Sequence, residues 1–280
     1  MPRLISMILL LACARAAGAQ SLLQDVRKDE PPPIQDNSFL MEEAYNQEEG
    51  VVQHINTFER MRGGEWMAAF TQEWPVPEQA HQLSYTIPYA RVGADGVSRT
   101  GLGDIALNYR YQLVGSGETK IAMAPRVSLL FPTGDRKDEL GSGGIGFQTN
   151  VAMSTVLSEK LVLHTNAGGT WTPRAKNAAG EAAATVGWNL GQSFIWTARH
   201  DFNVMVETVW NETQAVVGSR TTSTVHALFV SPGIRWAWNR PGNLQIVPGL
   251  AFPVGVGPSR GDRAVFVYLS FEHPMWAPAR

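Results

Sequence analysis

Residues 104–113 read DIALNYRYQL, in which apolar and polar side chains alternate. Because successive side chains of a β-strand point to opposite faces, Ile105 and the following odd-numbered residues would form one apolar face. The opposite face would carry Asn108 and Arg110. The same period of two recurs from Val51 to Glu272 and predicts an all-β chain.

Twelve alternating segments can be delimited in this region. They lie near 51–60, 65–74, 80–90, 101–114, 119–131, 144–157, 160–172, 184–198, 202–212, 223–238, 243–254 and 263–272. Tight connections such as 199–201 alternate with longer ones such as 132–143, which is typical of outer-membrane barrels with short periplasmic turns and long outer loops. We therefore expect a transmembrane antiparallel up-and-down β-barrel of about twelve strands over residues 51–272.

The surroundings of the barrel determine which face of each strand points outward and which points into the lumen. A sheet in lipid must close on itself to pair its backbone groups, and Arg110 or Arg126 facing lipid at mid-depth would cost about 2–4 kcal/mol each. The polar face should therefore line the lumen. The predicted lumen-lining residues are Asp104, Asn108, Arg110, Lys120, Arg126, Asn150, His164, Asn166, Asn189, Glu207 and Arg235.

Two expectations concern the charges of this set. A tight turn between the fourth and fifth segments would place Asp104 nearly opposite Arg126, so we expect an ion pair between them. The basic row of Arg110, Lys120 and Arg126 either holds the wall together or touches a polar or anionic group of a solute.

Composition excludes several classes of protein. The 280 residues include 23 Lys and Arg against 25 Asp and Glu, a net charge of −2 that gives no reason to expect a nucleic acid partner. Beyond residue 14 no stretch approaches the roughly 18 apolar residues of a spanning helix. A polytopic helical membrane protein is therefore excluded, whereas a membrane barrel is not.

The N-terminus has the features of a secretory signal peptide over residues 1–19. Arg3 precedes an apolar run, and Ala17-Gly18-Ala19 forms a small-residue cleavage site. The alternative is lipoprotein cleavage before Cys13, the only cysteine. Either signal exports the chain, and with the barrel pattern it predicts a bacterial outer-membrane location.

Residues 20–50 form an acidic segment interrupted by three prolines at 31–33. Ser38 could cap a short helix over residues 39–46. The segment is either a solvated leader, or a periplasmic flap or lumen plug that packs through Phe39, Leu40 and Tyr45. Residues 273–280 form a C-terminal tail.

No sequence motif indicates a cofactor, a metal site or a catalytic centre. The six histidines lack close metal-ligand spacing, and the glycine-rich stretch 141–146 leads into a strand rather than a helix. A hydrolase would need an activated serine beside a histidine, for which Ser154 and His164 are the nearest candidates. Neither residue carries a mark of activation, so we expect a protein that is not an enzyme.

Three stretches resemble one bacterial family. They are residues 34–47, IQDNSFLMEEAYNQ; residues 101–111, GLGDIALNYRY; and residues 129–135, LLFPTGD. The chain is similar over nearly its whole mature length to the outer-membrane barrels called the MetA-pathway of phenol degradation family. The resemblance implies passive transport of small hydrophobic or aromatic solutes, a lipid environment and insertion by the barrel assembly machinery. The alternative is a structural or sensing barrel with a plugged lumen.

Overall fold

The computed structural model describes residues 34–94 and 97–275. The predicted signal peptide, residues 20–33 and the last five positions of the predicted tail lie outside the described residues.

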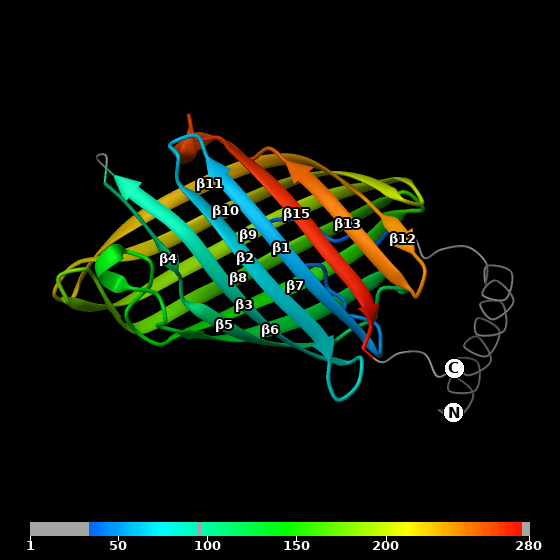
Figure 1. The fold of residues 1–280 in the computed structure, drawn as a ribbon, viewed down its shortest axis with the longest axis horizontal. Coiled ribbons are helices and arrows are strands. Elements are labelled where there is room, and N and C mark those ends of the chain that lie inside the picture. The colour runs from blue at the N-terminus through cyan, green and yellow to red at the C-terminus, as the bar shows by residue number, and fades with distance from the viewer. Residues whose placement is uncertain (1–33, 95–96, 276–280) are drawn as a thin grey trace, which may run out of the picture. The chain divides into compact units, whose positions relative to one another are not determined.

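Twelve antiparallel strands close into a ring (Figure 1). In ring order they are β13 (Leu244–Ala251), β15 (Ala264–Pro274), β1 (Val51–Met61), β2 (Trp66–Pro75), β3 (His81–Ala94), β5 (Ile105–Tyr111), β6 (Ile121–Phe131), β7 (Gly146–Ser158), β8 (Leu161–Lys176), β9 (Ala182–Arg199), β10 (Phe202–Gly218) and β11 (Thr221–Trp236). The predicted twelve-stranded barrel is confirmed, because each alternating segment contributes one ring strand.

Three short strands lie outside the ring: β4 (Val97–Leu102), β12 (Trp238–Arg240) and β14 (Val254–Gly255). β4 and β5 both pair with β3, so the segment predicted at 101–114 is one strand line interrupted at Gly103 and Asp104. Two single-turn 3₁₀ helices, η1 (Arg136–Asp138) and η2 (Gly257–Ser259), lie in connections. Among the described residues, no helix is long and apolar enough to cross a membrane.

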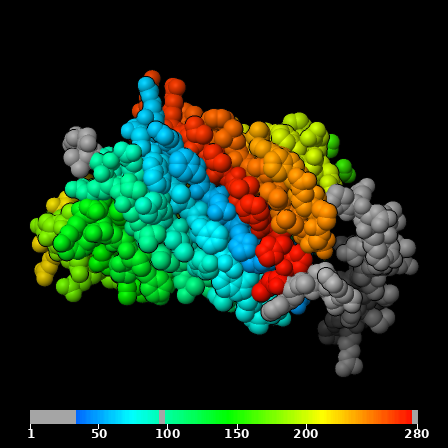
Figure 2. All heavy atoms as spheres, viewed as in Figure 1, coloured from blue at the N-terminus to red at the C-terminus, as the bar shows by residue number. Residues whose placement is uncertain are grey.

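Two strand pairs complete the ring, and the first of them joins the two ends of the barrel sequence. β1 pairs with β15 along its whole length, from Val51 opposite Pro274 to Met61 opposite Ala264. β11 pairs with β13 from Gly233 opposite Ala251 to Arg235 opposite Gly249. In Figure 2 the first strands and β15 form adjacent bands of one continuous wall. Each ring strand thus has a hydrogen-bonded neighbour on both sides, as a lipid environment requires.

Burial is inverted relative to a water-soluble protein. Outward-facing apolar side chains are exposed, with 46% of Leu107 and 53% of Val127 accessible, whereas the inward-facing Arg110 is only 4% accessible. The same contrast holds on β8, where Trp171 is 51% exposed and His164 is fully buried. Only a lipid exterior makes this arrangement favourable, since exposed apolar surface in water costs about 25 cal/mol per Å².

Candidate functional site

Residues 34–50, which we call the lumen segment, cross the interior of the barrel. At one end the Ile34 N–H donates to the carbonyl of His200, in the tight turn between β9 and β10 (2.9 Å). At the other end Gly50 leads directly into β1, and its carbonyl accepts from Met275 N–H (2.7 Å). The segment therefore enters and leaves at the end of the barrel that carries the short turns.

The predicted helix over residues 39–46 is wrong, because the lumen segment forms neither helix nor strand. Its backbone N–H groups donate to wall side chains instead. The pairs are Phe39 and Leu40 to Glu207 Oε1 (3.1 and 2.9 Å), Glu42 to Asn166 Oδ1 (2.9 Å), Ala44 to Ser154 Oγ (2.8 Å), Asn46 to Gln112 Oε1 (3.1 Å) and Gln47 to Gln82 Oε1 (2.7 Å). A helix would pair the N–H groups of Ala44, Asn46 and Gln47 internally and leave those of its first turn without partners, whereas here the wall supplies acceptors for both sets.

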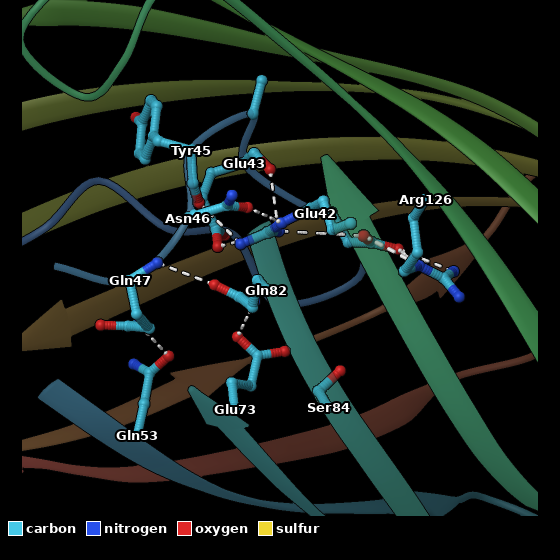
Figure 3. A network of polar contacts seen from close by, with 12 residues as sticks. Glu42, Glu43, Tyr45, Asn46, Gln47, Gln53, Glu73, Gln82, Ser84 and Arg126 are labelled. Carbon is cyan, nitrogen blue, oxygen red and sulfur yellow. Dashed lines mark hydrogen bonds and ion pairs between the residues drawn. The ribbon is translucent and has the colours of Figure 1, made fainter. Parts of the chain in front are cut away.

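Two guanidinium groups bind the lumen segment from the wall. Figure 3 shows the contact of Arg126 with Glu42. Arg126 forms a forked contact with the Glu42 carboxylate, from Nε to Oε1 (2.8 Å) and Oε2 (3.0 Å) and from Nη2 to Oε1 (2.8 Å). Arg110 donates to the carbonyls of Tyr45 (2.6 Å) and Glu43 (3.2 Å), and its Nη1 lies 3.5 Å from the Glu43 carboxylate. Both arginines are thus engaged with one stretch of five residues.

The predicted ion pair between Asp104 and Arg126 is wrong. The strand register places Arg126 opposite Arg110, and Asp104 lies beyond the end of β5. Asp104 instead accepts from Gly134 N–H (3.0 Å) and from the N–H and hydroxyl of Ser142 (both 2.7 Å). It anchors the long connection between β6 and β7.

The structure places the predicted lumen-lining residues in three groups. Fully or almost fully buried inside the ring are Asn108, Arg110, Asn150, His164, Asn166, Glu207 and Arg235. Partly accessible and lining an internal cavity are Asp104, Arg126 and Asn189. Lys120 alone forms the third group. It lies exposed in the turn before β6, separated from Arg110 and Arg126, and does not line the lumen as predicted.

Ser154 and His164 lie within hydrogen-bond distance, with 2.7 Å between Oγ and Nδ1. The second ring nitrogen, Nε2, lies 2.9 Å from the backbone carbonyl of Asp36, and Ser154 accepts from Ala44 N–H. A proton on Nε2 of His164 satisfies all three contacts at once. Both side chains are buried beneath the lumen segment, and this hydrogen-bond chain attaches it to β7 and β8.

Phe39, a packing residue in one of the two alternatives for residues 20–50, lies in a cradle whose wall residues were not predicted from the sequence. Its ring packs against Phe266 and Tyr268, with both ring centroids 5.5 Å away. A Cβ atom built on Gly249 would lie 2.5 Å from the Phe39 ring, and one on Gly233 would lie 2.7 Å from it. Glycine at these inward positions therefore makes room for the ring, and inward glycines on adjacent strands were the available sequence signal.

A cavity of about 720 Å³, which we call the vestibule, lies between the lumen segment and the end of the barrel that carries the long connections. Residues 39–42 line its floor. Its walls include Asp104 and Ser142, which belong to the end of the barrel with the long connections, and the amide side chains of Gln148 and Asn150. Among the residues that the structure describes, no group of three histidine, cysteine or acidic side chains could hold a metal ion.

The pKa of Glu42 predicts how acid affects the lumen segment. Burial raises this pKa, but the charges of Arg126 and Arg110 and the hydrogen bonds from Arg126 and Asn150 outweigh burial and hold it below 4.5. A carboxyl group whose pKa is lowered on docking stabilises the docked state fully at pH values above its ordinary pKa. This contribution is lost as the pH falls through the lowered pKa.

We therefore expect the contribution of Glu42 to docking stability to be the same at about pH 7 and at about pH 5. Hydrogen exchange of residues 39–46, corrected for intrinsic rates, measures the docking stability. As the pH falls through the lowered pKa of Glu42, this contribution to the stability should be lost. The difference between wild type and Glu42→Gln isolates this contribution from that of other groups. A difference that disappears between pH 7 and pH 5 would contradict the assignment.

Comparison with solved structures reveals the same fold at low sequence identity. The COG4313 outer membrane channel from Pseudomonas putida F1 is 12% identical, covers 84% of this chain and 99% of its own, and has a TM-score of 0.59. The NanC porin is 11% identical, covers 78% of this chain and 98% of its own, and has a TM-score of 0.53. No family model and no curated protein matches the chain.

Proposed function

We propose that this protein is a passive, non-enzymatic channel for small hydrophobic or aromatic solutes in the bacterial outer membrane. The observation that carries the proposal is the vestibule inside a closed barrel, which ends on a floor of residues 39–42. Solutes would enter at the long connections and pass the lumen segment when it shifts. The class of solute follows from the resemblance to the MetA-pathway of phenol degradation family, and Phe39, Leu40 and Met41 on the floor fit it.

The location follows from the surface of the barrel. Exposed apolar side chains around the ring require lipid. In this proposal residues 1–19 direct export and are removed, and the barrel assembly machinery inserts the mature chain into the outer membrane.

A second candidate function, a structural or sensing barrel, is favoured by the hydrogen bonds that attach the lumen segment to the wall. Six backbone donors between Phe39 and Gln47 have wall acceptors, so undocking would leave several polar groups without partners. A segment held this firmly could close the barrel permanently.

An uptake panel separates the two functions. We expect full-length protein to raise benzyl alcohol uptake about threefold or more over protein-free vesicles, with little effect on sucrose, because the floor of the vestibule presents the apolar side chains of Phe39, Leu40 and Met41. The vesicles need lipopolysaccharide in their outer leaflet, since phospholipid alone passes apolar solutes. Uptake only after deletion of residues 20–50 would favour the structural barrel, and no uptake by either protein would rule out transport.

A further inference from the structure

The carboxylate of Glu42 lies in a binding site that belongs to the wall. Arg126 on β6 holds both carboxylate oxygens, and Asn150 on β7 donates its Nδ2 to Oε1 (3.0 Å). A forked guanidinium contact supported by an amide donor is the usual geometry of carboxylate recognition. The lumen segment supplies only the acid.

This site faces the vestibule. Glu42, Arg126 and Asn150 all line the cavity, and the Glu42 and Arg126 side chains are 29% and 16% accessible. Arg110 differs, because its side chain is 4% accessible and is engaged with backbone carbonyls beneath the floor. A solute in the vestibule can therefore reach Arg126 without passing the lumen segment.

The wall keeps Arg126 in place independently of Glu42. Its Nη2 donates to Gln148 Oε1 (2.9 Å), its Nη1 donates to Asn108 Oδ1 (3.1 Å), and it also contacts the Ser128 hydroxyl. If Glu42 moved away, the guanidinium would remain oriented and, among the described residues, would have no carboxylate within ion-pair distance. A partly buried cation without a partner is costly, so the site would then favour an anion.

We infer that Arg126 and Asn150 form a carboxylate-binding site for solutes, and that Glu42 occupies it as an internal competitor. A small organic monocarboxylate that enters the vestibule displaces the Glu42 side chain and pairs with Arg126. Displacement also removes one of the contacts that attach the lumen segment to the wall. The inference rests on the proposed function for the route of the solute and adds a chemical group to its class.

Competition sets the expected strength of binding. A tethered carboxylate acts at an effective concentration of about millimolar or higher, so a free carboxylate binds wild type weakly. Removing the tethered charge removes the competitor. Glu42→Gln should therefore bind benzoate about tenfold or more tightly than wild type.

The test uses full-length protein in detergent and isothermal titration with benzoate, with benzyl alcohol as the neutral analogue. Glu48→Gln is the matched control, because it removes the same charge from an exposed position of the same segment. We expect it to bind benzoate within about twofold of wild type and all variants to bind benzyl alcohol alike. Equal benzoate affinity of Glu42→Gln and wild type would overturn the inference.

The double variant Arg126→Gln with Glu42→Gln should lose the tighter benzoate binding that Glu42→Gln alone shows. If this double variant fails to fold, as judged by gel mobility before and after boiling, the comparison of Glu42→Gln with Glu48→Gln still decides the matter. Titration needs no transport, so its result is separate from the uptake panel. If Glu42→Gln binds benzoate more tightly than wild type but no solute is taken up, the channel function is refuted and the carboxylate-binding site is retained.

Discussion

Deletion of residues 20–50 should raise the single-channel conductance about tenfold or more. In the intact protein the lumen segment crosses the barrel and binds strands around the ring, from Glu207 on β10 to Gln82 on β3. Twelve strands enclose an interior wider than eight strands, whose side chains fill it. Without the segment, the polar inward side chains would border water and ions could pass.

The deletion needs a control for folding, since the wall side chains lose their hydrogen-bond partners. The variant should still migrate faster on a gel before boiling than after, as closed barrels do. Conductance in planar bilayers is then compared between folded proteins only. A folded deletion variant with the conductance of the full-length protein would contradict the assignment of residues 34–50 as the obstruction.

Gly249→Ala should release the lumen segment without removing it. The new Cβ would lie 2.5 Å from two atoms of the Phe39 ring, in a cradle closed by Phe266 and Tyr268. Overpacking of this kind costs about 1–3 kcal/mol, which corresponds to an increase of about 5- to 150-fold in the undocked fraction. We expect faster hydrogen exchange of residues 39–46 and a higher frequency of channel opening.

Two further variants make this prediction specific. In a Phe39→Ala background the new methyl group has space, so Gly249→Ala should accelerate exchange less there than in the wild-type background. Gly63→Ala is the matched glycine control, because a Cβ at Gly63, in the turn between β1 and β2, meets no atom within 4 Å. Equal exchange rates in wild type and Gly249→Ala would show that the cradle does not hold Phe39.

The barrel could be predicted from the sequence because lipid and lumen impose a period of two on every strand. Residues 107–111 alternate in burial as their sequence alternates in polarity. The break between β4 and β5 could not be predicted, since Asp104 leaves the strand line to bind Gly134 and Ser142, which are distant in sequence. Alternation does not encode such contacts.

The contents of the lumen were less predictable than its wall. The alternation of side chains along the strands placed Asn150 and Asn166 on the polar face, and both are buried inside the ring. Their partner, Glu42, belongs to an irregular segment that has no period to fix its register against the strands. For the same reason a helix was expected where wall side chains accept the backbone hydrogen bonds.

The most direct test of the central claim, that residues 34–50 lie inside a membrane barrel, is disulfide formation in intact membranes. Ala44 N–H lies 2.8 Å from Ser154 Oγ, so Ala44→Cys with Ser154→Cys, in a Cys13→Ser background without other cysteines, should oxidise to a bridge. Val151, on the same strand but 43% exposed on the outer face, supplies the control pair Ala44→Cys with Val151→Cys. The account predicts a bridge in the first pair only. A bridge in the control pair, or none in the first, would contradict it.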